Sequence, residues 1–386
     1  MPASTLATAT EQRNAWHEID LNALAHNVAT LRATLGTGVE LIAVVKANAY
    51  GHGVEGIAPA LEQAGVDRFA VVWASEAIAL RTFGATFPIL VLGHSFPGDS
   101  ESIITHDITS VVHSLQLGEA LSAAAKRRGT TARVHIKVDT GLHRFGVAAD
   151  QAVVLAEQLR ELPSLVVEGL TTHMANADEA DDSFGERQDA LFAAAAARLP
   201  WIGYRHTANS ATALRRPGFR YEGVRIGLAL HGILPPNTPS PAAGLQPTLS
   251  LKARIARVTE IAAGEGVSYG LTWKAEQASR VGLIPVGYAD GWRRSIGHGG
   301  SVLVRGQRCP IVGRVAMDQF VVDLTAIPDV VEGEESVLLG TQGQSAITVD
   351  EIAALQDTIA WEVLAGLQAR LPRIYHRGGV VERIVG

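Results

Sequence analysis

The residues best suited to chemistry lie where strand-length apolar runs end. Lys46 follows the run 41–45, His173 follows another such run, and Arg225 lies within a third. A lysine usually keeps its ammonium in water. At the end of a buried strand, however, desolvation lowers the amine pKa from about 10.4 toward that of a nucleophile. Lys46 is therefore a candidate for a Schiff base with an aldehyde.

Eight apolar runs of this kind precede residue 230, and helical patterns such as 115–128 and 148–159 lie between many of them. The alternation predicts parallel strands with crossover helices, and eight units predict a (β/α)8 barrel of the TIM type. An open doubly wound sheet is the competing α/β arrangement, although no GxGxxG motif follows the first strand. In a barrel the strand ends meet at one mouth, where catalytic groups collect. The eight runs are 41–45, 69–72, 89–92, 109–112, 134–138, 166–170, 204–207 and 224–226.

A domain boundary is predicted at the proline-rich stretch 234–241, which suits neither a helix nor a central strand. Beyond it, helical patterns give way to short β-rich runs. We expect a flexible leader over residues 1–15, a cofactor-binding barrel over 16–240 and a smaller, mainly β domain over 241–386. A first helix is expected from Leu21 to Leu35, with Asp20 as its N-cap.

The composition is that of an ordinary soluble globular protein. Of 386 residues, 47% are hydrophobic and 19% charged, and the net charge of −6 argues against a nucleic-acid partner. Cys309 is the single cysteine, and the first ten residues lack a secretory pattern, so we expect a cytoplasmic protein. No stretch predicts a membrane span, and no Cys/His spacing predicts a metal site.

The decapeptide Val-Val-Lys-Ala-Asn-Ala-Tyr-Gly-His-Gly, residues 44–53, resembles the pyridoxal-phosphate signature of alanine racemases. Further blocks of that family follow in the family's order, and the resemblance extends from about Trp16 to Tyr375. These blocks are 139–146, 206–210, 224–227, 267–270, 287–291 and 313–318.

The resemblance implies a barrel followed by a β domain, with pyridoxal 5'-phosphate (PLP) held by Lys46 as an internal aldimine. It implies an isomerase that interconverts L- and D-alanine and supplies D-alanine for peptidoglycan. Proton transfer on both faces of the cofactor needs two bases. By resemblance these are Lys46 and Tyr269, and Tyr269 reaches in from the second subunit of a homodimer.

Other roles follow from the resemblance, residue by residue. Arg225 matches the arginine that donates to the pyridine nitrogen, and His173 matches the partner of the catalytic tyrosine. Arg144 matches a contact of the cofactor phenolic oxygen and the substrate carboxylate, and the backbone amide of Met317 matches another carboxylate contact. The matching cofactor contacts are Lys46, Tyr50, Arg144, His173, Asn209, Ser210, Arg225 and Gly227, of which Tyr50, Ser210 and Gly227 anchor the phosphate. The supporting and substrate-corridor positions are Lys137, Asp178, Tyr288, Arg294, Arg314 and Asp318.

Several of these residues have simpler interpretations. Ser210, which opens an expected helix, is explained by N-capping alone. Arg225 could be a structural arginine paired with an acid, and His173 a loop residue. Lys137 matches a position that can be carbamylated in the family, or it is an ordinary salt-bridge lysine.

The chain departs from the family pattern at His231, Leu271 and Trp361, which leaves the phosphate cradle, pocket lining and dimer contacts open. A broad-specificity amino-acid racemase is the main alternative function. A decarboxylase of basic amino acids and a non-catalytic PLP carrier are two others. Val267 to Gly270 and Arg225 argue against the decarboxylase, and the residues after Pro241 argue against the carrier.

Overall fold

The computed structural model describes residues 14–386, which fall into two compact units. One unit comprises Ala23–Ala49 and Ile57–Gln246. The other comprises the described part of Met1–Asn22 with Tyr50–Gly56 and Pro247–Gly386. Residues 1–13 of the expected leader lie outside the described residues.

The first unit is built on eight adjacent parallel strands, in the order β8-β7-β6-β5-β4-β3-β2-β9. Backbone hydrogen bonds from Glu222 N to Arg205 O (3.1 Å) and from Arg225 N to Ala208 O (2.9 Å) link β8 to β9 and nearly close the sheet. All eight predicted runs are strands, which confirms the barrel over the open sheet. The strands are β2 (Glu40–Val44), β3 (Arg68–Val71), β4 (Ile89–Val91), β5 (Ile108–Val112), β6 (Ala132–Lys137), β7 (Leu165–Thr171), β8 (Tyr204–His206) and β9 (Gly223–Ile226).

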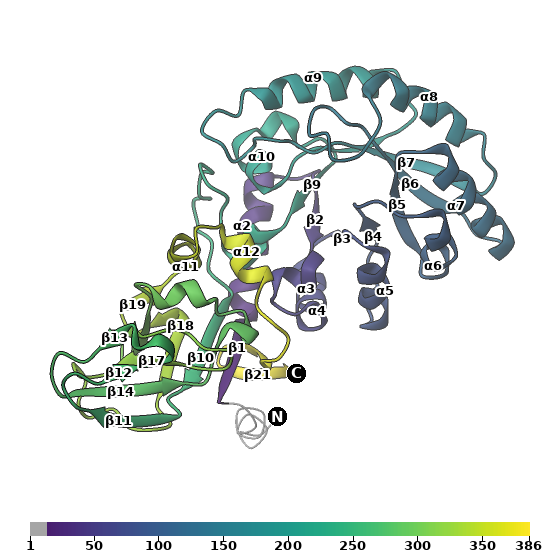
Figure 1. Ribbon diagram of the computed structural model, residues 1–386. Helices are drawn as coiled ribbons and strands as arrows, with labels where there is room; N and C mark the ends of the chain where they lie inside the picture. The colour runs from purple at the N-terminus through teal and green to yellow at the C-terminus, as the bar shows by residue number, and fades with distance from the viewer. Residues whose placement is uncertain (1–13) are drawn as a thin grey trace. The chain divides into compact units, whose positions relative to one another are not determined.

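Helices connect these strands and lie outside the curved sheet, with α8 and α9 along its upper side in Figure 1. The predicted first helix is confirmed as α2, which begins directly after Asp20. The helices are α2 (Leu21–Leu35), α3 (Lys46–Tyr50), α4 (Val54–Ala64), α5 (Ala74–Thr82), α6 (Ser100–Thr105), α7 (Leu115–Arg128), α8 (Ala149–Arg160), α9 (Phe184–Ala197) and α10 (Ser210–Arg215), with the 3-10 turns η1 (Pro97–Asp99), η2 (Pro217–Phe219) and η3 (Leu228–His231).

Residue 169 is a glycine, and its lack of a side chain makes room for a polar group inside the barrel. His135 on β6 is fully buried, and a Cβ added at Gly169 on β7 would lie 2.9 to 3.0 Å from its ring atoms. The pairing of β6 with β7 shifts register between Val134 and His135, which leaves Glu168 as an extra residue in β7. The interior of this barrel is thus partly polar.

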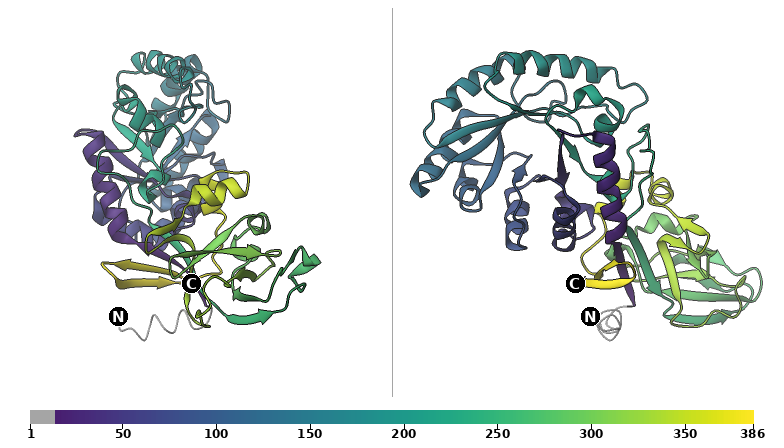
Figure 2. Two further views of the ribbon diagram at one scale, coloured as in Figure 1. Left: turned by 90° about the vertical axis from the view of Figure 1, so that its left-hand side faces the viewer. Right: turned by 180° about the vertical axis from the view of Figure 1, so that it is seen from behind.

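The second unit contains an 11-stranded sheet in which β1 lies between β10 and β20. Figure 2 shows its green and yellow strands from two further sides. Its elements are β1 (Ala15–Asp20), β10 (Leu249–Arg254), β11 (Arg257–Ile261), β12 (Gly266–Val267), η4 (Tyr269–Leu271), β13 (Trp273–Lys274), β14 (Ser279–Ile284), η5 (Tyr288–Asp290), η6 (Arg294–Gly297), β15 (Ser301–Val304), β16 (Gln307–Val312), β17 (Phe320–Asp323), β18 (Glu335–Gln342), β19 (Ser345–Ile347), α11 (Val349–Leu355), α12 (Ala360–Ala365), β20 (Arg373–Arg377) and β21 (Val380–Val385).

The compact units differ from a contiguous division at residue 240. β1 pairs antiparallel with β10 and parallel with β20, so the start of the described chain lies in the β unit. Segment Tyr50–Gly56 joins the same unit because Arg373 Nε donates to Gly51 O (2.8 Å) and Tyr375 Oη donates to His52 O (2.9 Å). Such long-range contacts leave no periodic signal in the sequence.

Between residues 14 and 386, no helix combines the length and the apolar character that crossing a bilayer requires.

We predict that Gly169→Ala destabilises the protein by about 1–3 kcal/mol, because the added methyl group overpacks against His135. Urea unfolding followed by circular dichroism measures the loss. Gly203→Ala is the matched control, since a Cβ there meets nothing within 4 Å. Equal stability of the two variants would contradict the packing argument.

Candidate active site at the carboxyl ends of the barrel strands

Lys46 stands two residues beyond the end of β2, at the start of a left-handed turn. Ala47, Asn48, Ala49 and Tyr50 all have φ between 50° and 55°. This conformation is unfavourable by roughly 1–2 kcal/mol for each non-glycine residue. The turn is stabilised by hydrogen bonds from Ala47 N to Glu76 Oε1 (2.7 Å) and from Ala49 N to Val45 O (3.0 Å). The strained backbone fixes where the Lys46 side chain begins.

Desolvation, followed by the positive charge of Arg144, lowers the pKa of Lys46, while Glu76 opposes the shift. Glu76 also accepts from Val72 N (2.9 Å) and Trp73 N (3.1 Å), so one carboxylate ties the turn after β2 to the start of α5. A lower amine pKa increases the fraction of neutral lysine, the form that attacks a carbonyl.

Arg225 on β9 is buried, with 3% of its surface exposed, and its guanidinium is held by neutral acceptors. Nη1 donates to His206 Nδ1 and His206 O, both at 2.8 Å, and Nη2 donates to Thr207 O (2.7 Å) and His173 Nδ1 (3.1 Å). Desolvation lowers the pKa of Arg225 to about 10, so the group stays cationic at neutral pH. No carboxylate among residues 14–386 forms an ion pair with it, so pairing with an acid does not explain this arginine.

His173 and Lys137 extend this buried, positively charged region. Desolvation and then the nearby Arg225 charge lower the pKa of both groups well below their usual values. Because His173 Nδ1 accepts from Arg225, its proton lies on Nε2. Lys137 is 6% exposed, and within the described chain no carboxylate lies within ion-pair distance of it. The ordinary salt-bridge interpretation of Lys137 is therefore not supported.

Arg144 lies in the exposed loop after β6, which Asp139 shapes. Asp139 Oδ1 accepts from Gly141 N and His143 N, both at 3.1 Å, and His143 has a φ of 54°. Arg144 lies close enough to lower the pKa of Lys46, Lys137 and His173. The loop therefore brings a forked cation to the mouth of the barrel.

Gln188 on α9 links the loop after β6 to the loop after β7. Its Nε2 donates to Thr140 Oγ1 and to His173 O, both at 3.1 Å, and its Oε1 accepts from Ala175 N (2.8 Å). Gln188 is fully buried, so these bonds replace the water that its amide loses.

Ser210 and Asn209 have different roles at the start of α10. Asn209 is the N-cap, because its Oδ1 accepts from Thr212 N (3.0 Å), so the N-cap interpretation of Ser210 is wrong. Ser210 Oγ instead accepts from Gly227 N (3.2 Å), which leaves its O–H group able to donate. The structure thus brings Ser210 and Gly227 together.

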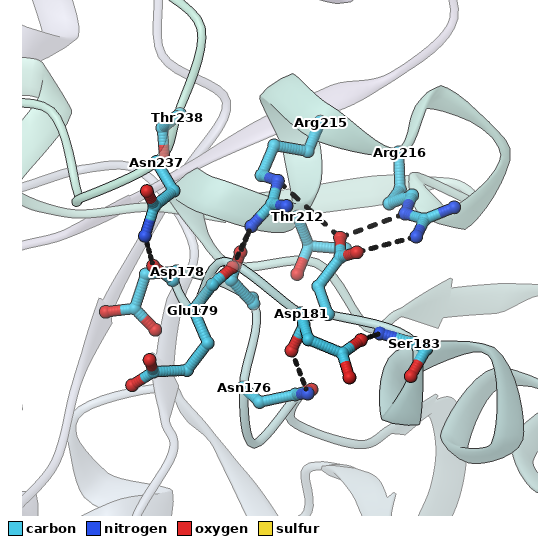
Figure 3. A network of polar contacts seen from close by, with 12 residues as sticks. Asn176, Asp178, Glu179, Asp181, Ser183, Thr212, Arg215, Arg216, Asn237 and Thr238 are labelled. Carbon is cyan, nitrogen blue, oxygen red and sulfur yellow. Dashed lines mark hydrogen bonds and ion pairs between the residues drawn. The ribbon is translucent and has the colours of Figure 1, made fainter.

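The loop that carries Asp178 is held by side chains, as Figure 3 shows. Arg215 Nη1 donates to Ala177 O (2.8 Å) and Glu179 O (2.7 Å), and Asn237 Nδ2 donates to Asp178 O (2.9 Å). Arg216 forms a two-pronged ion pair with Asp182. The loop after His173 therefore has a defined path.

In the second unit, Tyr50 is buried and lies at the start of the segment that β20 holds. Gly53 has a φ of +87°, and a Cβ there would lie 2.0 Å from Tyr375 Oη. The hydroxyl of Tyr375 donates to Gly53 O (3.1 Å), so a close approach needs glycine at this position.

Tyr269, Tyr288 and Met317 are exposed residues of the second unit, with 72%, 43% and 53% of their surface accessible. Ser268 Oγ donates to Arg314 O (2.7 Å), and Tyr288 N donates to Ala316 O (3.1 Å). These two bonds place Tyr269 and Tyr288 beside the segment that carries Arg314 and Met317. Asp318 accepts from Arg370 Nη2 (2.8 Å), and Arg294 is exposed in η6.

The three departures from the family pattern occupy different surroundings. His231 is fully buried in η3, Leu271 is 55% exposed beside Tyr269, and Trp361 is half-buried in α12.

Family models match both parts of the chain. The model of the alanine racemase N-terminal domain matches residues 19–235, and that of the C-terminal domain matches residues 248–375. The chain belongs to the alanine racemase family. Members of this family depend on PLP and are isomerases.

Individual proteins agree with the family models. The chain is 40% identical to an alanine racemase of Symbiobacterium thermophilum over 94% of this chain and 97% of that protein. The structure of an alanine racemase of Clostridium difficile 630 superposes with a TM-score of 0.92 at 33% identity, covering 96% of this chain and 98% of that one. A histidine racemase of Leuconostoc mesenteroides superposes with a TM-score of 0.87 at 29% identity, covering 94% and 98%.

Several residues that shape the site of this alanine racemase family member were not predicted as functional. They are Glu76, Gln188 and His206. One signal could have found Gln188, because it shares the buried face of α9 with Gly185 and Phe192, where a polar residue needs hydrogen-bond partners.

The buried neutral histidines predict a pH dependence of stability. The unfolded chain protonates His173 and His206 near pH 6.5, whereas the folded chain resists protonation. Stability is therefore fully present above pH 6.5 and falls as the pH decreases, by about 1.4 kcal/mol per pH unit for each group. Urea unfolding between pH 7.5 and 5 should show a shallower slope in His206→Gln. The same variant at pH 8 is the control for lost contacts, and an unchanged slope would argue against a neutral buried His206.

Proposed function

We propose that this chain is a PLP-dependent racemase that interconverts L- and D-alanine, with Lys46 and Tyr269 as the two bases, and that it supplies D-alanine for peptidoglycan in the cytoplasm. The observation that carries the proposal is the buried Arg225 cation at the mouth that Lys46 occupies. A guanidinium does not readily give up its proton, so a ring nitrogen facing it stays unprotonated. That setting favours simple proton return over reactions that need a strongly stabilised carbanion.

The residues present fit the cofactor. Arg225 uses Nη1 and Nη2 for protein acceptors, and Nε has no acceptor within the described residues, which leaves it for the pyridine nitrogen. Ser210 and Gly227, with Tyr50 and Asn209, are proposed to hold the phosphate side. When bound, PLP supplies an electron-withdrawing group that acidifies the α-proton of the amino acid.

Proton transfer requires one base on each face of the substrate. Burial and the charge of Arg144 lower the pKa of the Lys46 amine, which favours its neutral, basic form. Tyr269 is 72% exposed in a single chain, which suits a residue that completes the site of a second subunit. His173 carries its proton on Nε2 and can donate it to a phenolate, thereby stabilising the basic form of Tyr269 of the partner subunit.

The remaining roles concern the substrate. Arg144 presents a fork of donors suited to a carboxylate, and the backbone amide of Met317 is proposed to assist from the partner subunit. Asp178, Tyr288, Arg294, Arg314 and Asp318 are proposed to line or support the substrate corridor. Burial and then the charges of Arg225 and Arg144 lower the pKa of the Lys137 amine, which favours the neutral form that reacts with carbon dioxide, so carbamylation of Lys137 is part of the proposal. Native intact-mass measurement tests that modification.

The first test follows optical rotation and α-proton exchange of L- and D-alanine together in heavy water. We expect the protein with PLP to racemise both enantiomers with uptake of deuterium. Tyr269→Phe should lower racemisation by about 100-fold or more and exchange the α-proton of only one enantiomer, with its chirality retained. Tyr221→Phe, which loses a phenol paired with Asp189 outside the site, is the control. Racemisation by Lys46→Ala at the wild-type rate would reject the assignment of Lys46.

A broad-specificity racemase is the second candidate, favoured by the similarity to a histidine racemase. Rates with alanine, serine, lysine, arginine and histidine separate the two, because pocket volume and polarity decide the preference. A clear preference for alanine supports the first proposal.

The shared-site homodimer predicts complementation between two inactive variants. Mixing Lys46→Ala with Tyr269→Phe chains and allowing subunit exchange places an intact Lys46 opposite an intact Tyr269 in one site of each mixed dimer. Activity should recover to about one quarter of the wild-type value, because half of the dimers are mixed and each has one complete site of two. Each variant alone is the control, and an inactive mixture with proven subunit exchange would contradict a site built from two chains.

A further inference from the structure

A line of buried polar groups runs from Arg225 to Glu168 through the barrel interior. Arg225 Nη1 lies 2.8 Å from His206 Nδ1, and His206 Nε2 lies 2.8 Å from His135 Nδ1. His135 Nε2 lies 3.3 Å from Glu168 Oε2, which is ion-pair distance, although the alignment is not that of a hydrogen bond. Both imidazoles are fully buried, so water cannot replace these contacts.

The groups at the two ends of this line determine which ring nitrogens donate and which accept. A guanidinium has only donors, so His206 Nδ1 must accept, and the proton of a neutral His206 lies on Nε2. That proton is donated to His135 Nδ1, which places the proton of His135 on Nε2, facing Glu168. An ionised carboxylate has only acceptors, so the direction agrees at the far end as well. Each hydrogen in the line then has one place.

The charges around the line are consistent with this arrangement. Desolvation, the largest cause, lowers the pKa of both histidines, which keeps them neutral. Burial alone would raise the pKa of Glu168, but contacts with His135 and Arg68 outweigh it and lower the pKa to about 2. Arg68 Nη2 donates to Glu168 Oε1 (2.9 Å), and Arg68 also faces Glu40 at 3.5 Å.

The backbone is adapted to hold Glu168 in place. Glu168 is the extra residue of the β7 irregularity, which can re-aim a side chain. The next residue is Gly169, whose missing Cβ leaves the space that the His135 ring fills. Two separate features thus bring the carboxylate and the imidazole together.

We propose that Glu168 is a positioning residue for Arg225. Through His135 it fixes the proton of His206 on Nε2, so that the lone pair of Nδ1 faces the guanidinium. With the opposite tautomer, an N–H of His206 would face an N–H of Arg225, and the guanidinium would have to shift. This inference rests on the proposed function only for its effect on catalysis, since the proton positions can be measured in any state of the protein.

The first experiment labels the full-length protein with [15N]histidine and records long-range 1H–15N spectra at pH 7. His206→Gln and His135→Gln assign the two rings among the 13 histidines. We expect both rings to be neutral with the proton on Nε2. A proton on Nδ1 of either ring, or a cationic ring, would overturn the proposal without bearing on racemase activity.

The second experiment compares Glu168→Gln with Glu222→Gln. A single amide oxygen cannot serve both Arg68 and His135, so Glu168→Gln should change the His206 tautomer signal, shift the cofactor absorption of the holoenzyme and lower kcat about tenfold or more. Glu222→Gln also removes a carboxylate paired with an arginine, Arg205, but contacts no histidine side chain, so it should leave all three readouts unchanged. Glu168→Asp keeps the charge and should restore part of kcat.

Glu168→Gln with wild-type tautomers, or with altered tautomers but wild-type kcat and absorption, would overturn the positioning role. If Glu168→Gln does not fold, the positioning role of Glu168 is still tested by the tautomers of the wild-type protein and by the tautomers and kcat of the Glu168→Asp variant. If no racemase activity is found for any chain, the proposed function fails, whereas the tautomer measurement stands by itself.

Discussion

A buried guanidinium that contacts no carboxylate of residues 14–386 is the constraint on which the barrel mouth depends. Arg225 must be satisfied by oxygen and nitrogen lone pairs, and these come from the ends of neighbouring strands: Thr207 O, His206 and His173. A buried charge is unfavourable unless it is hydrogen-bonded. If the strand ends moved apart, the Arg225 guanidinium would lose its acceptors, so the strand ends are held together. The arginine therefore organises the backbone around it as much as the backbone holds the arginine.

Positive charge accumulates around this group and shapes the chemistry of its neighbours. Lys46, Lys137 and His173 all lie where an added proton is unfavourable, and each is held toward its neutral form. The strained turn after Lys46 adds geometric rigidity to this electrostatic effect. Reactive amines and a hydrogen-bond donor with a defined proton position are the result.

Strand-length runs and helical spacing were sufficient to predict the eight barrel strands, the first helix and the change to β structure after the proline-rich stretch. The family blocks named the residues expected at the mouth. Neither kind of signal reaches pairings between distant segments, so the position of β1 between β10 and β20 was not foreseen. Gln188, Glu76 and Glu168 were missed for a related reason: each acts on backbone or side chains far away in sequence, and a single carboxylate or amide in a helix or strand usually faces solvent.

The close approach of His135 to Gly169 has a consequence for how such a barrel can vary. The ring fills the space that any larger residue at position 169 would need, so neither position is free to change alone. A side chain at 169 requires a smaller residue at 135, and loss of the ring would leave a cavity and a carboxylate without its contact. Positions 135 and 169 therefore have to change together, because the volume of the side chain at one limits which side chains fit at the other.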